Sequence, residues 1–72
     1  MELQAFQEAF GNKLNQLMTE QKLSFSQLHN STQLGKTYLR QITEGKCNVS
    51  LDVIRRLSIA LKVPPTYFFD WQ

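Results

Sequence analysis

The chain has 72 residues, 42% of them apolar, with three Gly, two Pro and a net charge of +2. This composition excludes a disordered tail and predicts one small domain over residues 1–72, near the lower size limit for folding without metal or disulfide support. Because the sequence shows neither a signal sequence nor an apolar run that could span a bilayer, and its single Cys47 has no internal partner, we expect a cytoplasmic protein without a membrane partner.

The first predicted helix covers about residues 2–21. Apolar side chains recur there at spacings of three and four residues, which predicts one stripe facing a core: Leu3, Phe6, Phe10, Leu14 and Leu17. Gly11 interrupts this helix and costs it about 1 kcal/mol relative to Ala. It either marks the close approach of a neighbouring segment or is simply a weak point.

A second helix is predicted over about residues 24–31. Ser24 followed by Gln27 forms a capping box, in which each side chain bonds a backbone N–H that the helix leaves unsatisfied. Leu23 and Leu28 have the spacing of a hydrophobic staple around this start. The helix is expected to be short, because three consecutive polar residues that favour caps and turns follow at positions 30–32.

The third predicted helix, residues 36–44, begins after Gly35 and ends at Gly45, which can adopt the left-handed conformation of a helix end. Leu39 and Ile42 fall on one side of it. The opposite side carries only polar side chains, Lys36, Thr37, Arg40, Gln41 and Glu44. Taken alone, this pattern is typical of any amphipathic surface helix, so the role of the polar face has to be inferred from the neighbouring motifs.

A fourth helix is predicted over residues 50–61 and a fifth over residues 65–69. Ser50 caps the fourth helix, and the prolines at positions 64 and 65 end it and open the fifth. Arg55, Arg56 and Ser58 are expected on the outer side of the fourth helix. No alternating strand pattern is present, so the predicted fold class is all-α.

Aromatic side chains are concentrated at the end of the chain. Tyr67, Phe68, Phe69 and Trp71 are four of the eight aromatic residues, and they cannot all enter so small a core. We expect Phe68 to close the core. For Phe69 and Trp71, core closure and an exposed patch through which two copies pair are equally open interpretations.

The distribution of charge and the reactive side chains indicate which classes of function are compatible with the sequence. Residues 36–62 contain six basic and two acidic residues, so positive charge gathers around the third helix. The single His29 has no Cys or carboxylate at ligand spacing and is interpreted as a packing or surface residue, and Cys47 as a small loop residue. No catalytic set, metal-ligand spacing or phosphate-binding loop can be assembled, so we expect no enzyme activity, no metal and no cofactor.

These motifs, in this order, resemble the Cro/C1-type helix-turn-helix family of phage and bacterial repressors, also called the XRE family. The resemblance extends from about residue 10 to residue 69. It rests on Ser24 with Leu28 and on three stretches: TYLRQITEG at residues 37–45, NVSL at residues 48–51 and LSIALKV at residues 57–63. The chain departs from the family pattern where His29 replaces a small Ala and where Gln33 and Lys62 replace glycines. We therefore expect the angle between the two motif helices to differ from the family norm.

The resemblance implies a five-helix, lambda-repressor-like DNA-binding domain and a small dimeric transcriptional regulator, such as a repressor. The second motif helix of this family lies in the major groove. By position, the implied base contacts are Lys36, Thr37, Arg40 and Gln41, and the implied phosphate contacts are Gln27, Tyr38, Lys46 and Asn48.

We expect a homodimer on a pseudo-palindromic double-stranded operator, with half-site centres roughly 34 Å apart. The alternative is a protein-interaction module of the same fold, such as an antitoxin or adaptor; the clustered positive charge argues against it, and the aromatic tail leaves it open. A phage repressor, a restriction-modification controller and an antitoxin-regulator are all compatible with the sequence.

Overall fold

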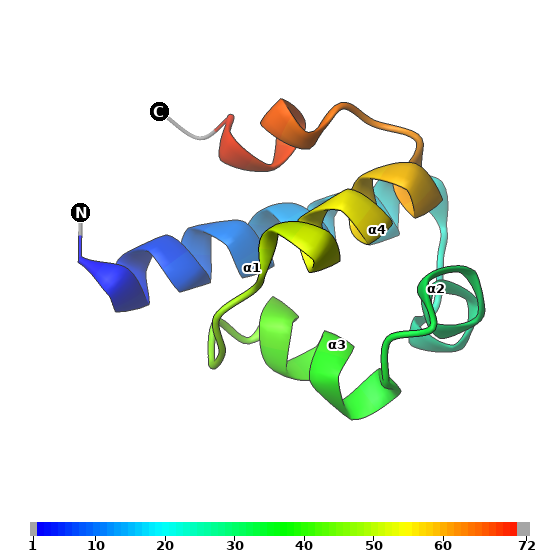
Figure 1. The fold of residues 1–72 in the computed structure, drawn as a ribbon, viewed down its shortest axis with the longest axis horizontal. Helices are drawn as coiled ribbons and strands as arrows, with labels where there is room; N and C mark the ends of the chain where they lie inside the picture. Colours follow the sequence, from blue (N-terminus) through cyan, green and yellow to red (C-terminus); the bar gives the residue numbers. More distant parts are fainter. Residues whose placement is uncertain (1, 71–72) are drawn as a thin grey trace.

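Four α-helices and one 3₁₀ helix make up the computed structural model, which describes residues 2–70 (Figure 1). The α-helices are α1 (Leu3–Gln21), α2 (Phe25–Thr32), α3 (Lys36–Thr43) and α4 (Leu51–Leu61), and the 3₁₀ helix is η1 (Pro65–Phe69). No strand occurs in residues 2–70. No helix of this part is long and apolar enough to cross a membrane.

The predicted count of five helices is not confirmed as a count of α-helices: the structure has four, and the segment predicted as the fifth helix is a 3₁₀ helix with the predicted bounds. Pro65 has no backbone N–H, and η1 has only five residues. The first turn of η1 is closed by a hydrogen bond that Tyr67 N donates to Pro64 O at 3.0 Å. The two residues have the i to i+3 spacing of a 3₁₀ turn.

The starts of α2 and α4 are set by serine caps. Ser24 Oγ accepts from Gln27 N at 3.1 Å, and Gln27 Oε1 accepts from Ser24 N at 2.8 Å, which confirms the predicted capping box. Ser50 Oγ accepts from Val53 N at 3.1 Å. Both helices begin one residue after the predicted position, because the capping serine itself has extended backbone angles.

Three helices end on a left-handed residue that is not glycine. Lys22, Gln33 and Lys62 have φ of 58°, 65° and 59°. Gly45, just beyond α3, has φ of 73°, as predicted for the end of this helix. Bonds that span the ends, such as Leu23 N to Met18 O at 2.9 Å, satisfy carbonyls that the helices would otherwise leave free.

The core combines apolar side chains from every helix. It contains Phe10, Leu14, Leu17 and Met18 of α1, Leu28 of α2, Leu39 and Ile42 of α3, Val53, Leu57 and Leu61 of α4, and Phe68 of η1. Phe68 is fully buried and stacks on Phe10 with ring centroids 5.0 Å apart, so the prediction that it closes the core is confirmed.

Three predicted orientations are wrong. Leu3 and Phe6 were expected in the core stripe but are 63% and 43% exposed, because the first turns of α1 extend beyond α3 and α4 (Figure 1). Ser58 was expected outside but is buried, since its hydroxyl donates to Ile54 O at 2.8 Å and needs no water.

Gly11 marks the place where α3 contacts α1. A Cβ atom added to Gly11 would lie 2.2 Å from Ile42 O and 2.9 Å from Thr43 O, closer than any carbon can approach a backbone oxygen. A Cβ on Gly45 would likewise lie 2.7 Å from Glu8 Cγ and 2.9 Å from Glu8 Cα. Of the two interpretations of Gly11, the structure supports the close approach of a neighbour.

Gly11→Ala should therefore destabilise the protein. Helix propensity alone would make this change stabilising by about 1 kcal/mol. The clash with the α3 backbone should reverse the sign and lower the free energy of unfolding by about 1–3 kcal/mol, as overpacking does. Urea unfolding followed by circular dichroism measures the difference.

The matched control is Asn15→Ala on the exposed side of the same helix. It should stabilise the protein by about 0.5 kcal/mol, because Ala is the better helix former. If both variants are more stable than the wild type, α1 and α3 do not contact as described.

Candidate nucleic-acid interface

Residues 33–35 form a tight turn between α2 and α3 that is held by side chains of α2. Thr32 Oγ1 donates to Leu28 O at 2.7 Å and accepts from Leu34 N at 3.1 Å. His29 Nδ1 lies 2.6 Å from Leu34 O, and since a carbonyl only accepts, this contact requires the proton on Nδ1. The half-buried His29 is thus a structural residue of the turn, and α2 and α3 form a helix-turn-helix unit.

α3 presents the predicted polar face to solvent. Leu39 and Ile42 are buried at 0% and 1% exposure, which fixes how the helix is rotated about its axis. The four candidates for base contacts are all exposed: Lys36, Thr37, Arg40 and Gln41. The structure therefore brings these four side chains together on the outer side of one short helix.

Two candidates for phosphate contacts lie at opposite ends of this unit. Gln27 is exposed in the first turn of α2, and its Oε1 is already engaged in the capping box. Its amide N–H₂ group is the part that can donate to a ligand. Lys46 is exposed beyond α3, and its Nζ lies 3.4 Å from Glu44 Oε1, a surface ion pair of the kind that contributes little to stability.

The other two candidates hold the loop between α3 and α4. Tyr38 Oη donates to Asn48 O at 3.3 Å, and Asn48 Oδ1 accepts a hydrogen bond from Gln7 Nε2 of α1. Burial, and secondarily the neighbouring Cys47, raises the pKa of the Tyr38 phenol above its ordinary value, so the phenol remains a donor at neutral pH. Burial also raises the pKa of the Cys47 thiol.

The candidates for a dimer interface lie elsewhere. Phe69 packs against Phe6 and Phe10, with ring centroids 5.9 Å apart in both pairs. It also lines a mainly apolar hollow of about 270 Å³, together with Leu3, Phe6, Val49 and others. Trp71 lies outside the described residues.

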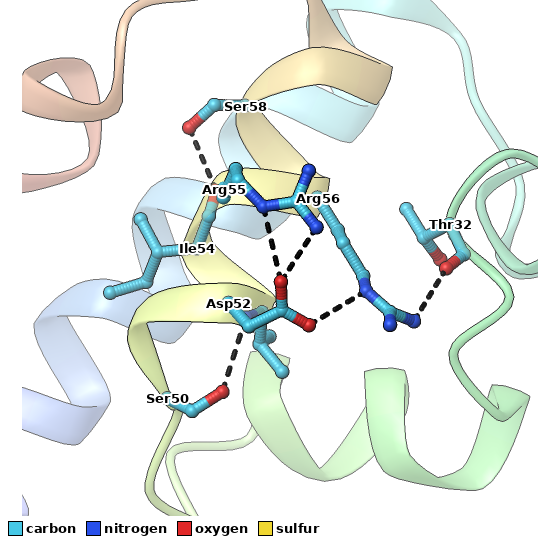
Figure 2. Close-up of polar contacts among 8 residues, drawn as sticks. Thr32, Ser50, Asp52, Ile54, Arg55, Arg56 and Ser58 are labelled. Carbon is cyan, nitrogen blue, oxygen red and sulfur yellow. Dashed lines mark hydrogen bonds and ion pairs between the residues drawn. The ribbon is translucent and has the colours of Figure 1, made fainter.

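Arg55 and Arg56 lie on the outer side of α4 as expected, and both of them pair with one carboxylate, that of Asp52 (Figure 2). Asp52 Oδ1 accepts from Arg55 Nη2 at 2.6 Å, and Asp52 Oδ2 lies 2.9 Å from Arg56 Nε. Arg56 is only half exposed, and its Nη1 donates to Thr32 O at 3.3 Å, at the end of α2. The spacings of three and four residues from Asp52 were a signal that could have predicted this cluster.

The polar face of α3 makes one contact that no pattern in the sequence predicts. The guanidinium carbon of Arg40 lies over the ring of Phe25, 5.7 Å from its centroid. Phe25 is the first residue of α2, and only the angle between the two helices brings these side chains together. Within residues 2–70, no three His, Cys, Asp or Glu side chains gather closely enough to hold a metal ion.

A family model described as the Cro/C1-type HTH DNA-binding domain matches residues 13–72 of this chain. The chain belongs to this family. The Cro/C1-type assignment makes DNA binding and transcription regulation the function of its helix-turn-helix, and it confirms the resemblance inferred from the sequence.

Two known proteins are similar to this chain over most of its length. The control protein C.BamHI of Bacillus amyloliquefaciens is 37% identical over 68 residues, which cover 86% of this chain and 78% of that protein. The crystal structure of the restriction-modification controller protein C.AhdI from Aeromonas hydrophila superposes with a TM-score of 0.87 at 34% identity. That match covers 90% of this chain and 98% of the controller.

The Asp52 cluster of this Cro/C1-type domain should make its stability depend on pH in the acid range. Hydrogen bonding to Arg55 is the main cause that lowers the Asp52 pKa below its ordinary value, and the charges of Arg56 and Arg55 act in the same direction. The charged carboxylate therefore stabilises the fold at a pH above about 3.9, the ordinary carboxyl value. This contribution is lost as the pH falls through the lower pKa of the folded state.

Asp52→Asn should lower the melting temperature slightly near pH 6, and the difference from the wild type should close as the pH falls through the lowered pKa of Asp52. Thermal scans across this range test the prediction. Asp70→Asn is the control, because it removes an exposed carboxylate that makes no ion pair with residues 2–70. An Asp52→Asn profile parallel to that of the control would contradict the assignment.

Proposed function

We propose that this protein acts in the cytoplasm as a non-enzymatic, sequence-specific DNA-binding regulator, and that its targets are the genes of a restriction-modification system. The observation that carries the proposal is the polar face of α3, which is fixed in rotation by two buried residues and exposed outside the helix-turn-helix. The similarity to a control protein and to a restriction-modification controller supports this role over a phage repressor or an antitoxin.

In the proposed complex, α3 lies in the major groove. Lys36 and Arg40 donate to O6 and N7 of guanine, Gln41 bonds bidentately to adenine, and the Thr37 methyl group contacts a thymine methyl group. All four side chains are exposed, so none of them is needed to fill the core. Sequence preference is thereby assigned to four side chains on one helix.

Phosphate contacts set the register of α3 in the groove. We assign them to the Gln27 amide at the start of α2 and to the Lys46 ammonium after α3. Tyr38 and Asn48 form a second layer: their mutual bond and the Gln7 contact hold the loop that carries Lys46. In this proposal the Asn48 amide N–H₂ group faces the same phosphate strand, while Tyr38, whose single hydroxyl proton is donated to Asn48 O, acts by holding the loop.

A homodimer on a pseudo-palindrome completes the proposal, because a single copy offers too few contacts for tight binding. The apolar hollow beside Leu3 and Phe69 is the surface assigned to pairing, together with Trp71 of the chain terminus. Leu3 is 63% exposed at its edge, and burying such a side chain against a second copy is favourable. The four candidates for base contacts do not line this hollow.

Selection of binding sites from a randomised duplex pool, at near-physiological salt, tests the function. The expected result is an enriched palindrome with half-sites one helical turn apart. Failure of the folded protein to enrich any sequence would contradict the proposal and favour a protein partner for the same fold.

Substitutions should separate base reading from phosphate binding on the selected operator. Arg40→Ala and Gln41→Ala should each cost about 1–3 kcal/mol at one base position and relax the preference there. Lys46→Ala should weaken binding to all sequences alike and reduce the salt slope by about one unit. Fluorescence anisotropy across operator variants and salt concentrations distinguishes the two patterns, and a uniform loss from Arg40→Ala would refute its role.

Leu3→Glu should shift the protein from dimer to monomer in sedimentation experiments, because a charge would be buried at the assigned surface. Glu in the first turn suits the helix dipole, so the monomer should stay folded. Ile59→Glu, at a side chain of α4 that is 65% exposed and does not line the hollow, is the matched control. If only Ile59→Glu dissociates the dimer, the interface lies on α4.

A further inference from the structure

Phe25 occupies an unusual place for an apolar ring. It is the first residue of α2, its side chain is half-buried against the core, and the guanidinium of Arg40 from α3 lies over its ring. The distance of 5.7 Å from the guanidinium carbon to the ring centroid lies within the range of a cation–π contact. Helix position alone does not require an aromatic residue there.

Both partners of this contact have fixed backbones. The capping box between Ser24 and Gln27 holds the turn that carries Phe25. Leu39 and Ile42, buried on either side of Arg40 in the sequence, fix the place of Arg40 on α3. The ring and the root of the arginine side chain are therefore held at a constant separation.

The Arg40 guanidinium has no competing partner of opposite charge in the described part of the chain. Within residues 2–70, ion pairs form between Glu44 and Lys46 and between Asp52 and its two arginines, and none includes Arg40. An aromatic ring has no hydrogen-bond acceptor comparable to a carboxylate oxygen, so this contact leaves the guanidinium N–H donors for a ligand. The ring thus restricts the arginine without an ion pair that a base would have to displace.

We propose that Phe25 is the positioning residue of Arg40: its ring holds the guanidinium over the outer side of α3 before DNA binds and so sharpens base discrimination. This inference rests on the base-reading role proposed above for Arg40. An arginine side chain loses much rotamer freedom when it binds a base, and a side chain already restricted by the ring loses less. Phe25 itself is not assigned a base contact.

The contact can be tested without DNA. Aromatic ring currents should shift the Arg40 Hδ and Hε resonances upfield in NMR spectra of the wild-type protein. Phe25→Leu, which keeps an apolar side chain of similar size, should abolish this shift, and Phe25→Tyr should retain it. Equal Arg40 shifts in the wild type and Phe25→Leu would overturn the proposal.

The positioning role is tested by affinities for the selected operator and for versions altered at the position that Arg40 reads. Phe25→Leu should lower discrimination at that position roughly two- to fivefold, the scale of an exposed cation–π contact, and Phe25→Tyr should restore it. Phe25→Leu should have no further effect on discrimination in an Arg40→Ala background. An equal loss in both backgrounds, or a loss spread over all positions, would overturn the role.

The outcomes separate this inference from the function on which it rests. A folded wild-type protein without any sequence preference would overturn both. A preference that Arg40→Ala removes and Phe25→Leu leaves intact would overturn only the role of Phe25. Melting temperatures of the Phe25 variants verify that each variant is folded at the temperature of the binding measurements.

Discussion

The contact between α1 and the end of α3 is the constraint on which the rest of the structure depends. It exists because Gly11 has no side chain, so that the carbonyls of Ile42 and Thr43 can lie directly against α1. The close contact of Gly45 with Glu8 extends it by one turn. A helix of eight residues is too short to be stable alone, and this contact with a longer helix gives it a fixed place.

Polar side chains then fix the remaining orientation of the helix-turn-helix. Thr32 and His29 bond to the turn, and Arg56 reaches from α4 to the end of α2. Arg55 and Arg56 also form ion pairs with Asp52, which neutralises part of their positive charge. The positive charge left around α3 comes mainly from Lys36 and Arg40, which are the side chains proposed to read bases.

Local rules predicted much of this architecture from the sequence. The capping box at Ser24, the helix end at Gly45 and the polar side of α3 each depend on residues close together in the chain, and each is present in the structure. The 3₁₀ form of the last segment was missed, since a proline followed by aromatic residues is compatible with either helix type. The individual DNA contacts remain predictions.

The errors arose where distant segments decide the outcome. Periodicity placed Leu3 and Phe6 in the core stripe, but it cannot show that the neighbouring helices do not reach the first turns of α1. Ser58 is buried because its hydroxyl bonds within its own helix, a choice that polarity patterns do not reveal. The Phe25 and Arg40 contact depends on an interhelical angle, which no spacing in the sequence encodes.

The left-handed helix ends at Lys22, Gln33 and Lys62 bear on how such turns are recognised in other sequences. A residue with a Cβ atom is strained in this conformation by roughly 1–2 kcal/mol. Glycine avoids the strain, but its unfolded chain has more conformations to lose. The two effects oppose each other, so replacing glycine by lysine or glutamine changes net stability less than the strain suggests. Turns of this fold can therefore drift away from glycine during evolution while the helices still end at the same positions.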